Sequence, residues 1–319
     1  MLAYDFPEIV RRYLDALERS MAQALVTVLQ PEPLATTADR LAAGTALGTL
    51  GDPRPGVCDL HLDWCNVAAG AYTLGSDDND ADAAADEKPL QTVTLPAFRI
   101  SRYPVTNAQW RLFMDEGGYT NEHWRSELGR NARDQGFDYM GDPTNTPWTE
   151  PAYWNDERFS APNQPVVGVS WYEAQALCAW LSQRLGFVVT LPTEAQWEAA
   201  ARGLARPMYP WGDDWDADRA NTEASNLSRT TVVGSYPHGA SWCGALDMSG
   251  NVWEWTCSDW NDADRANEID ITNNSTSVSV HGGAWFYIRQ NARCAFRDWF
   301  APHIRANVLG LRVVTPLTM

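Results

Sequence analysis

The most informative stretch of the sequence is HGGAWFYIRQNARCAFRDWFAPHIRANVLGLRVV, residues 281–314. It begins with a glycine pair and ends in Gly-Leu-Arg-Val-Val, with arginines and a proline between these ends. The aromatic and apolar side chains among these points follow neither the two-residue period of a strand nor the 3.6-residue period of a helix for long. We therefore expect a loop-rich scaffold that carries an irregular aromatic surface.

The composition indicates a globular protein and excludes several classes of partner. Of the 319 residues, 45% are apolar and 16 are tryptophan, so the chain can bury a large core and pin its loops with aromatic rings. No apolar run approaches the length of a membrane span, and we expect no membrane insertion. The net charge of -17 opposes binding to phosphate backbones, so we expect no nucleic-acid partner.

The N-terminus and the cysteines bear on the cellular compartment. Residues 1–20 lack a basic segment followed by an apolar core, so no secretory signal is visible and we expect a cytoplasmic protein. The cysteines are scattered without the spacing of metal ligands. In a chain of this size, that pattern favours buried free thiols over disulfides.

We divide the chain into three parts. Residues 1–30 carry apolar side chains at three- and four-residue steps, which predicts an amphipathic helix. Its apolar face either packs on the main domain or joins copies of the chain, so the oligomeric state stays open. Residues 31–62 are rich in proline and are interpreted as a linker. Residues 63–315 form the main domain, with the segment 281–314 at its end.

The main domain combines short strands with capped helices. Strands are expected at three places: 72–74, 91–95 and 98–100. Two helices begin with a capping box: Ser170 with Glu173, and Thr193 with Gln196. The acidic loop 76–87 lacks the ligand spacing of an EF-hand, so a solvated loop is favoured over a calcium site. These signals indicate an α+β fold in which two capped helices pack on short antiparallel strands.

A series of motifs in a specific order runs from Leu191 to the C-terminus: LPTEAQWEAAARG, YPWGDDWDADRANT, VVGSYP, LDMSGNVWEWT, HGGAW, RCAFRDWFAP and GLRVV. Earlier segments such as WCNVAAGAYTLGS and QPVVGVSWYEAQALCAWLS fit the same series. Residues 63–315 thus resemble the formylglycine-generating-enzyme family, also called the sulfatase-modifying-factor family. The resemblance implies an elaborated C-type lectin fold, which is a scaffold that hosts several unrelated activities.

The resemblance also implies where catalytic residues would lie. Formylglycine-generating enzymes hold copper with two cysteines placed five residues apart, since soft thiolates suit Cu(I). Cys294 matches the second of these cysteines, but Arg289 occupies the position of the first. The related iron-dependent sulfoxide synthases use a His-x3-His-x-Glu motif, and this chain has no histidine before His61. We therefore expect no catalytic residue and no enzyme activity.

Asn251 and Glu254 match positions where family members bind calcium through oxygen ligands, and Asn221 resembles part of a second such site. We expect no required cofactor, and structural calcium is the metal ion that these positions would bind. The alternative is that Asn251 holds a turn and that Glu254 makes an internal hydrogen bond. The acidic partner expected near Asn221 is not evident in the residues that follow it.

Within the family, the segment 281–314 most resembles the variable proteins of diversity-generating retroelements, whose C-terminal codons are rewritten at adenines. The frame of their pattern is matched by Gly282, Gly283, Trp285, Arg293, Ala295, Arg297, Pro302, Arg305, Gly310, Arg312 and Val313. Leu311 replaces the usual phenylalanine. The side chains between the frame residues form the expected binding surface: Phe286, Tyr287, Ile288, Asn291, Phe296, Asp298, Trp299, Phe300, His303, Ile304 and Asn307. Rewriting adenines in AAC or AAT codons never gives tryptophan, so Trp299 is either fixed or evidence against such an origin.

Two functions remain in view. The leading expectation is a ligand-binding module with a hypervariable C-terminal surface, whose ligand is an unknown protein. The alternative is a metal-dependent oxidase of the formylglycine-generating type that acts on a cysteine or another thiol. The rings between the frame residues could also be ordinary core, because a sequence does not show exposure.

Overall fold

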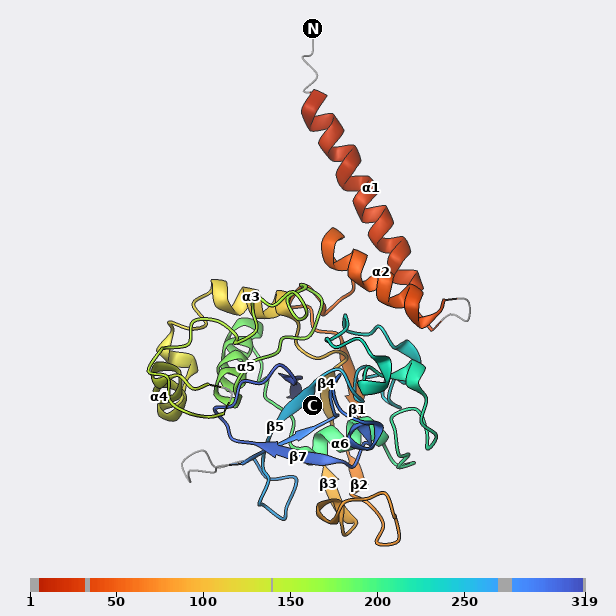
Figure 1. The fold of residues 1–319 in the computed structure, drawn as a ribbon, viewed down its shortest axis with the longest axis vertical. Helices are drawn as coiled ribbons and strands as arrows, with labels where there is room; N and C mark the ends of the chain where they lie inside the picture. The colour runs from red at the N-terminus through yellow and green to blue at the C-terminus, as the bar shows by residue number, and fades with distance from the viewer. Residues whose placement is uncertain (1–5, 32–34, 139, 269–276, 318–319) are drawn as a thin grey trace.

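A computed structural model describes residues 6–31, 35–138, 140–268 and 277–317. Short strands lie at the centre of the domain, flanked by helices and long loops (Figure 1). The α-helices are α1 (Phe6–Val28), α2 (Thr37–Leu50), α3 (Asn107–Asp115), α4 (Glu127–Gln135), α5 (Trp171–Leu185) and α6 (Glu194–Arg202). The strands are β1 (Trp64–Val67), β2 (Gly70–Leu74), β3 (Gln91–Leu95), β4 (Phe98–Ser101), β5 (Trp253–Asp259), β6 (Val278–His281), β7 (Arg297–Phe300), β8 (Leu309–Leu311) and β9 (Val314–Pro316).

Three small sheets organise the domain. β1, β4 and β9 form the first, β2 and β3 the second, and β7, β6, β5 and β8 the third. Neighbouring strands are antiparallel except for β5 and β8, which run parallel. The C-terminal part of the chain therefore supplies strands to two sheets. The predicted α+β class with short antiparallel strands is confirmed, with this one parallel pair added.

The two predicted capping boxes are present and fix where the central helices begin. At the start of α5, the Ser170 hydroxyl accepts a hydrogen bond from the Glu173 N–H, and the Glu173 carboxylate accepts one from the Ser170 N–H. Thr193 and Gln196 make the same exchange at the start of α6. These bonds satisfy N–H groups that have no partner within the helix. α6 contacts β2, β5 and β6, so one capped helix touches two of the sheets.

The structure has a second helix where the sequence suggested a linker. α2 begins after Thr36, whose hydroxyl accepts the Asp39 N–H while the Asp39 carboxylate accepts the Thr36 N–H. Ala22, Leu29 and Leu47 form a small core between α1 and α2. The prolines of this region lie outside α2, so they bound the helix and do not prevent it. The linker interpretation is therefore wrong for residues 37–50.

The predicted amphipathic helix is confirmed as α1, which projects away from the body of the domain (Figure 1). Apolar side chains towards its N-terminal end are exposed: Val10, Tyr13, Leu14, Leu17 and Met21. This half of α1 therefore does not pack on the main domain. Over the described ranges, no helix has the length and apolar character needed to cross a membrane.

Buried ion pairs attach the segment 281–314 to the rest of the domain. Four of its arginines each meet a buried glutamate from a distant element: Arg293 with Glu87, Arg297 with Glu194, Arg305 with Glu173, and Arg312 with Glu254. A buried charge without a partner is costly, so each pair restricts where the segment can lie. Glu87 is 0% exposed, so the acidic loop 76–87 is not solvated along its whole length.

The Arg312–Glu254 pair is the most deeply buried of the four, with both side chains 0% exposed. Arg312 donates to Glu254 through Nε at 2.5 Å and Nη2 at 2.8 Å. It also donates to the carbonyl oxygens of Ser101 and Leu246, at 3.0 and 2.8 Å. Trp197 Nε1 donates to Glu254 Oε2 at 2.5 Å. One guanidinium thus joins β4, β5 and the loop before β5.

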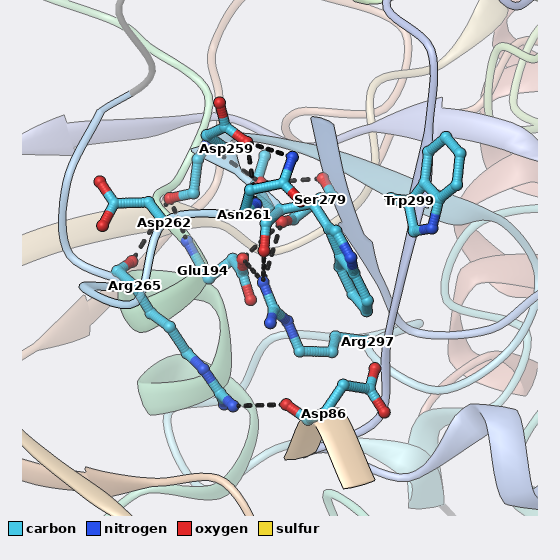
Figure 2. A network of polar contacts seen from close by, with 12 residues as sticks. Asp86, Glu194, Asp259, Asn261, Asp262, Arg265, Ser279, Arg297 and Trp299 are labelled. Carbon is cyan, nitrogen blue, oxygen red and sulfur yellow. Dashed lines mark hydrogen bonds and ion pairs between the residues drawn. The ribbon is translucent and has the colours of Figure 1, made fainter. Parts of the chain in front are cut away.

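Figure 2 shows the Arg297–Glu194 pair at the start of α6. Glu194 accepts hydrogen bonds from Arg297 at 2.5 Å, from the Ser279 hydroxyl, and from His281 Nε2 at 3.2 Å. Burial raises the pKa of Glu194, but the hydrogen bond from His281 and the charges of His281 and Arg297 outweigh it and lower the pKa to about 2. The Arg297 guanidinium also lies 4.0 Å from the centre of the Trp260 ring. Glu194 is therefore ionised in the folded protein at neutral pH.

Replacing Arg312 by alanine is expected to lower the free energy of unfolding by about 3–5 kcal/mol, because Glu254 then keeps a buried charge without a partner. Urea unfolding followed by tryptophan fluorescence measures the change. The control is Arg158→Ala, which removes a more exposed pair with Asp156 and should cost less than about 1 kcal/mol. A loss for Arg312→Ala no larger than that of the control contradicts the role given to this pair.

The low pKa of Glu194 makes stability depend on pH in one direction. In the unfolded chain a glutamate has a pKa of about 4.3. The ionised Glu194 carboxylate therefore stabilises the fold fully above that pH, and this stabilisation is lost as the pH falls towards about 2. Its size is on the order of 3 kcal/mol. We expect the stability difference between wild type and Glu194→Gln to shrink as the pH is lowered from about 5 to about 2. A difference that stays constant over this range would show that Glu194 is not ionised in the fold.

Candidate functional site

The segment 281–314 separates into buried and exposed side chains. Its frame is buried: Gly282, Gly283, Trp285, Arg293, Ala295, Arg297, Pro302, Arg305, Gly310, Leu311, Arg312 and Val313. The residues predicted to bind ligand all keep exposed surface: Phe286, Tyr287, Ile288, Asn291, Phe296, Asp298, Trp299, Phe300, His303, Ile304 and Asn307. We call this second set the C-terminal face. No residue of the C-terminal face is wholly buried, so each can contact a ligand. Its role in binding stays a prediction.

Three apolar side chains of the C-terminal face are largely exposed. Phe286 is 66% exposed, Ile288 51% and Trp299 46%. The Phe286 ring meets Trp285 and Tyr287 edge-on, with ring centres 5.5 and 6.3 Å apart. In Figure 2 the Trp299 ring stands apart from the Glu194 network. Large rings held from one side and open on the other are suited to binding.

Other members of the face are half-buried and rest on tryptophans of β5. Tyr287 and Phe296 contact Trp253, with ring centres 5.3 and 6.0 Å apart, and Phe300 contacts Trp255 at 6.2 Å. Burial raises the pKa of Tyr287, so its phenol is neutral at physiological pH. Trp253 and Trp255 of the motif LDMSGNVWEWT thus support part of the C-terminal face. The motif alone did not predict this contact.

Two titratable groups of the face have shifted pKa values. Burial lowers the pKa of His303, whose ring centre lies 4.4 Å from that of Phe137, so the imidazole is neutral at physiological pH. Burial raises the pKa of Asp298, whose carboxylate accepts the Trp299 N–H at 2.8 Å. The face therefore offers mainly neutral and aromatic chemistry to a ligand.

The positions of Arg289 and Cys294 do not form a copper site. Cys294 is 0% exposed, and burial raises the pKa of its thiol to about 12, so it is protonated at neutral pH. Arg289 is exposed. Within the described ranges, no group of three or more His, Cys, Asp and Glu side chains could hold a metal ion. Copper held by thiolates therefore does not fit this segment.

The side chains expected at the two calcium sites make hydrogen bonds within the protein. Asn221 Nδ2 donates to Asn251 Oδ1 at 3.2 Å, and Asn251 Oδ1 also accepts the Thr231 N–H at 2.9 Å. The carboxylate of Glu254 is engaged instead by Arg312 and Trp197. Asn251 has a φ of +67°, the left-handed conformation of a turn residue. These contacts favour the alternative of a turn and an internal hydrogen bond, and structural calcium stays a prediction.

Comparison with known proteins places the chain in a family. Residues 62–317 match the model described as sulfatase-modifying factor enzyme 1-like domain. Hercynine oxygenase of Mycolicibacterium thermoresistibile is 35% identical over 313 residues, which covers 90% of this chain and 65% of that protein. Formylglycine-generating enzyme of Thermomonospora curvata is 32% identical over 242 residues, which covers 66% of this chain and 76% of that protein. The chain thus spans slightly less than two thirds of the length of that hercynine oxygenase.

Solved structures support the fold. PvdO from Pseudomonas aeruginosa superposes with a TM-score of 0.61 and 25% identity, covering 83% of this chain and 99% of that chain. Treponema denticola variable protein 1 superposes with a TM-score of 0.55 and 21% identity, covering 80% and 95%. The second likeness concerns the fold alone. The predicted elaborated C-type lectin fold is confirmed.

The expectation of no enzyme activity is wrong as drawn from the sequence. Relatives that share 32–35% identity with this chain are named as enzymes, hercynine oxygenase and formylglycine-generating enzyme. Arg289 at the position of the first cysteine argues against the two-cysteine copper site, but it does not argue against catalysis in general. With residues 62–317 matched, the chain belongs to the sulfatase-modifying factor enzyme 1-like, or formylglycine-generating-enzyme, family.

Proposed function

We propose that residues 63–315 form the substrate-binding part of an oxidase-type enzyme that acts on a thiol. The observation that carries this proposal is the C-terminal face, a set of exposed aromatic side chains held on a buried frame. The names of the relatives, hercynine oxygenase and formylglycine-generating enzyme, favour oxidative chemistry. The metal-dependent oxidase, the alternative function indicated by the sequence, thus becomes the first candidate, without the copper site that the family resemblance implied.

The geometry of the face suits a substrate with an apolar part. Phe286, Ile288 and Trp299 offer exposed apolar area, and burying such area on binding is favourable. The ion pairs beneath them hold the backbone in place, so little further ordering is needed when a ligand binds. A thiol-bearing peptide or small molecule can therefore rest its apolar part on the face.

The proposal gives this domain substrate binding and does not give it the redox centre. Cys294 is a buried thiol, and the described ranges contain no cluster of three or more metal-ligating side chains. The chain covers 65% of the hercynine oxygenase, and the proposal assigns no redox centre to the described residues.

Calorimetric titration with a cysteine-containing peptide, and with the same peptide carrying serine instead, tests this function. We expect the cysteine peptide to bind more tightly, and Phe286→Ala to weaken its binding about tenfold, or about 1.4 kcal/mol, because an exposed aromatic anchor is lost. Leu204→Ala is the matched control, since Leu204 is 73% exposed and lies outside the face. Equal binding of the two peptides, or equal effects of the two substitutions, would contradict the proposal.

A second candidate is a protein-binding face that varies between copies of the gene. The alternation of a buried frame with exposed side chains favours it, because the exposed residues can change without loss of the fold. Trp299 counts against it, since this residue is exposed like the face and yet cannot arise by adenine rewriting of the usual template codons. A downstream repeat that differs only at adenines, beside a reverse-transcriptase gene, would support variation; a gene without this repeat rules it out.

A further inference from the structure

Cys65 and Cys243 lie far apart in the sequence and bring their thiols together in the fold. Cys65 is buried on β1, and Cys243 is partly exposed in the loop before β5. The two thiols are close enough for each to act on the pKa of the other as a hydrogen-bond partner, and both side chains pack in the same apolar cluster. The backbone of the next residue confirms their closeness, because a β-carbon placed on Gly244 would lie 3.8 Å from Cys65 Sγ.

The surroundings make Cys243 the more acidic of the two thiols. The hydrogen bond from Cys65 lowers the pKa of Cys243 to about 6 against the effect of burial, and the Ser241 hydroxyl, 3.3 Å from its sulfur, adds to the shift. The same hydrogen bond and burial raise the pKa of Cys65. Arg102 donates to the Gly244 carbonyl at 2.7 Å and adds positive charge beside the pair. Cys243 is thus a partly exposed thiol of lowered pKa, whose S–H donates to the Ala200 carbonyl at 3.4 Å, beside a buried thiol of raised pKa. This is the arrangement of an attacking and a resolving cysteine.

We propose that Cys65 and Cys243 form a redox-active pair, which closes to a disulfide when it reacts with a low-molecular-weight disulfide. The inference goes beyond the proposed function, because neither cysteine belongs to the C-terminal face. It also differs from the expected copper site, since Arg289 and Cys294 lie elsewhere in the chain.

The reaction consists of two thiol–disulfide exchanges. With oxidised glutathione, the Cys243 thiolate attacks one sulfur, forms a mixed disulfide and releases the first glutathione thiolate. Cys65 then loses its proton, its sulfur attacks the sulfur of Cys243, and the second glutathione thiolate leaves. The glutathione thiolates take up protons as solution pH requires. Two electrons pass from the cysteine pair to glutathione, so the protein is oxidised and the small disulfide is reduced.

The new bond would link β1 to the wall of a cavity. A cavity of about 580 Å³ lies between the N-terminal helices and the domain, and it is lined by Asp63, Arg102, Ala240, Gly244 and Leu246 among others. Cys65 lies two residues after Asp63, and Cys243 lies between Ala240 and Leu246, so each end of the disulfide is next to residues that line the cavity. Oxidation is therefore expected to fix these two parts of the lining to each other. A cross-link between positions this far apart also restricts the unfolded chain and stabilises the fold.

The test treats the full chain with oxidised glutathione, alkylates the remaining thiols and maps the peptides by mass spectrometry. We expect a peptide pair joined through Cys65 and Cys243, with the summed mass less two hydrogens. The Tm should rise by about 2 °C or more and return when dithiothreitol is added. A folded wild-type protein that ends with glutathione on Cys243, or that shows no Cys65–Cys243 link, overturns the proposal.

Three variants distinguish the roles of the thiols. Cys65→Ser should stop at the mixed disulfide on Cys243, and Cys243→Ser should form neither adduct nor link. Cys58→Ser is the matched control, because Cys58 is also partly exposed while burial raises its pKa, and this variant should react like wild type. Loss of the link in Cys58→Ser contradicts the assignment. If a variant fails to fold, the peptide map of the wild type still decides the outcome.

Discussion

Four buried arginine–glutamate pairs hold the segment 281–314 on the domain, and much of the structure depends on them. Their glutamates come from the loop before β3, from the first turns of α5 and α6, and from β5. A buried charge that loses its partner costs several kcal/mol, so the segment has one position in which all four arginines are satisfied. This constraint, more than regular secondary structure, places an irregular stretch of chain.

The same constraint explains how an unpatterned sequence can carry a defined surface. The frame takes the buried positions, and the side chains between them rest on Trp253 and Trp255 or extend into solvent. Binding chemistry is therefore concentrated in the C-terminal face, where the pKa shifts favour neutral side chains. The thiol of Cys294 lies within the frame and fills space there.

Local signals in the sequence predicted local structure well. Capping boxes at Ser170 and Thr193 gave the starts of α5 and α6, and the order of motifs gave the C-type lectin fold. The capping box at Thr36 was equally visible, but the prolines around it led to the linker interpretation. Propensity arguments fail in this way when breakers flank a helix without entering it.

Contacts between distant residues could not be predicted from the sequence. Arg293 and Glu87 are 206 positions apart, and no local pattern pairs one buried charge with the other. The calcium prediction for Glu254 rests on its own motif, whereas in the fold the distant Arg312 engages its carboxylate. The prediction of no enzyme activity fails because one missing cysteine bears on a copper site and not on catalysis in general.

Independence of frame and face is tested most directly by the thermal unfolding of two variants. A triple replacement of exposed face residues, Phe286→Asn, Ile288→Asn and Trp299→Asn, is predicted to keep the Tm within about 3 °C of wild type. The single frame replacement Arg305→Ala, which leaves Glu173 buried without its partner, is predicted to lower the Tm by about 6 °C or more. A triple variant that unfolds as readily as Arg305→Ala would contradict the division of the segment into frame and face.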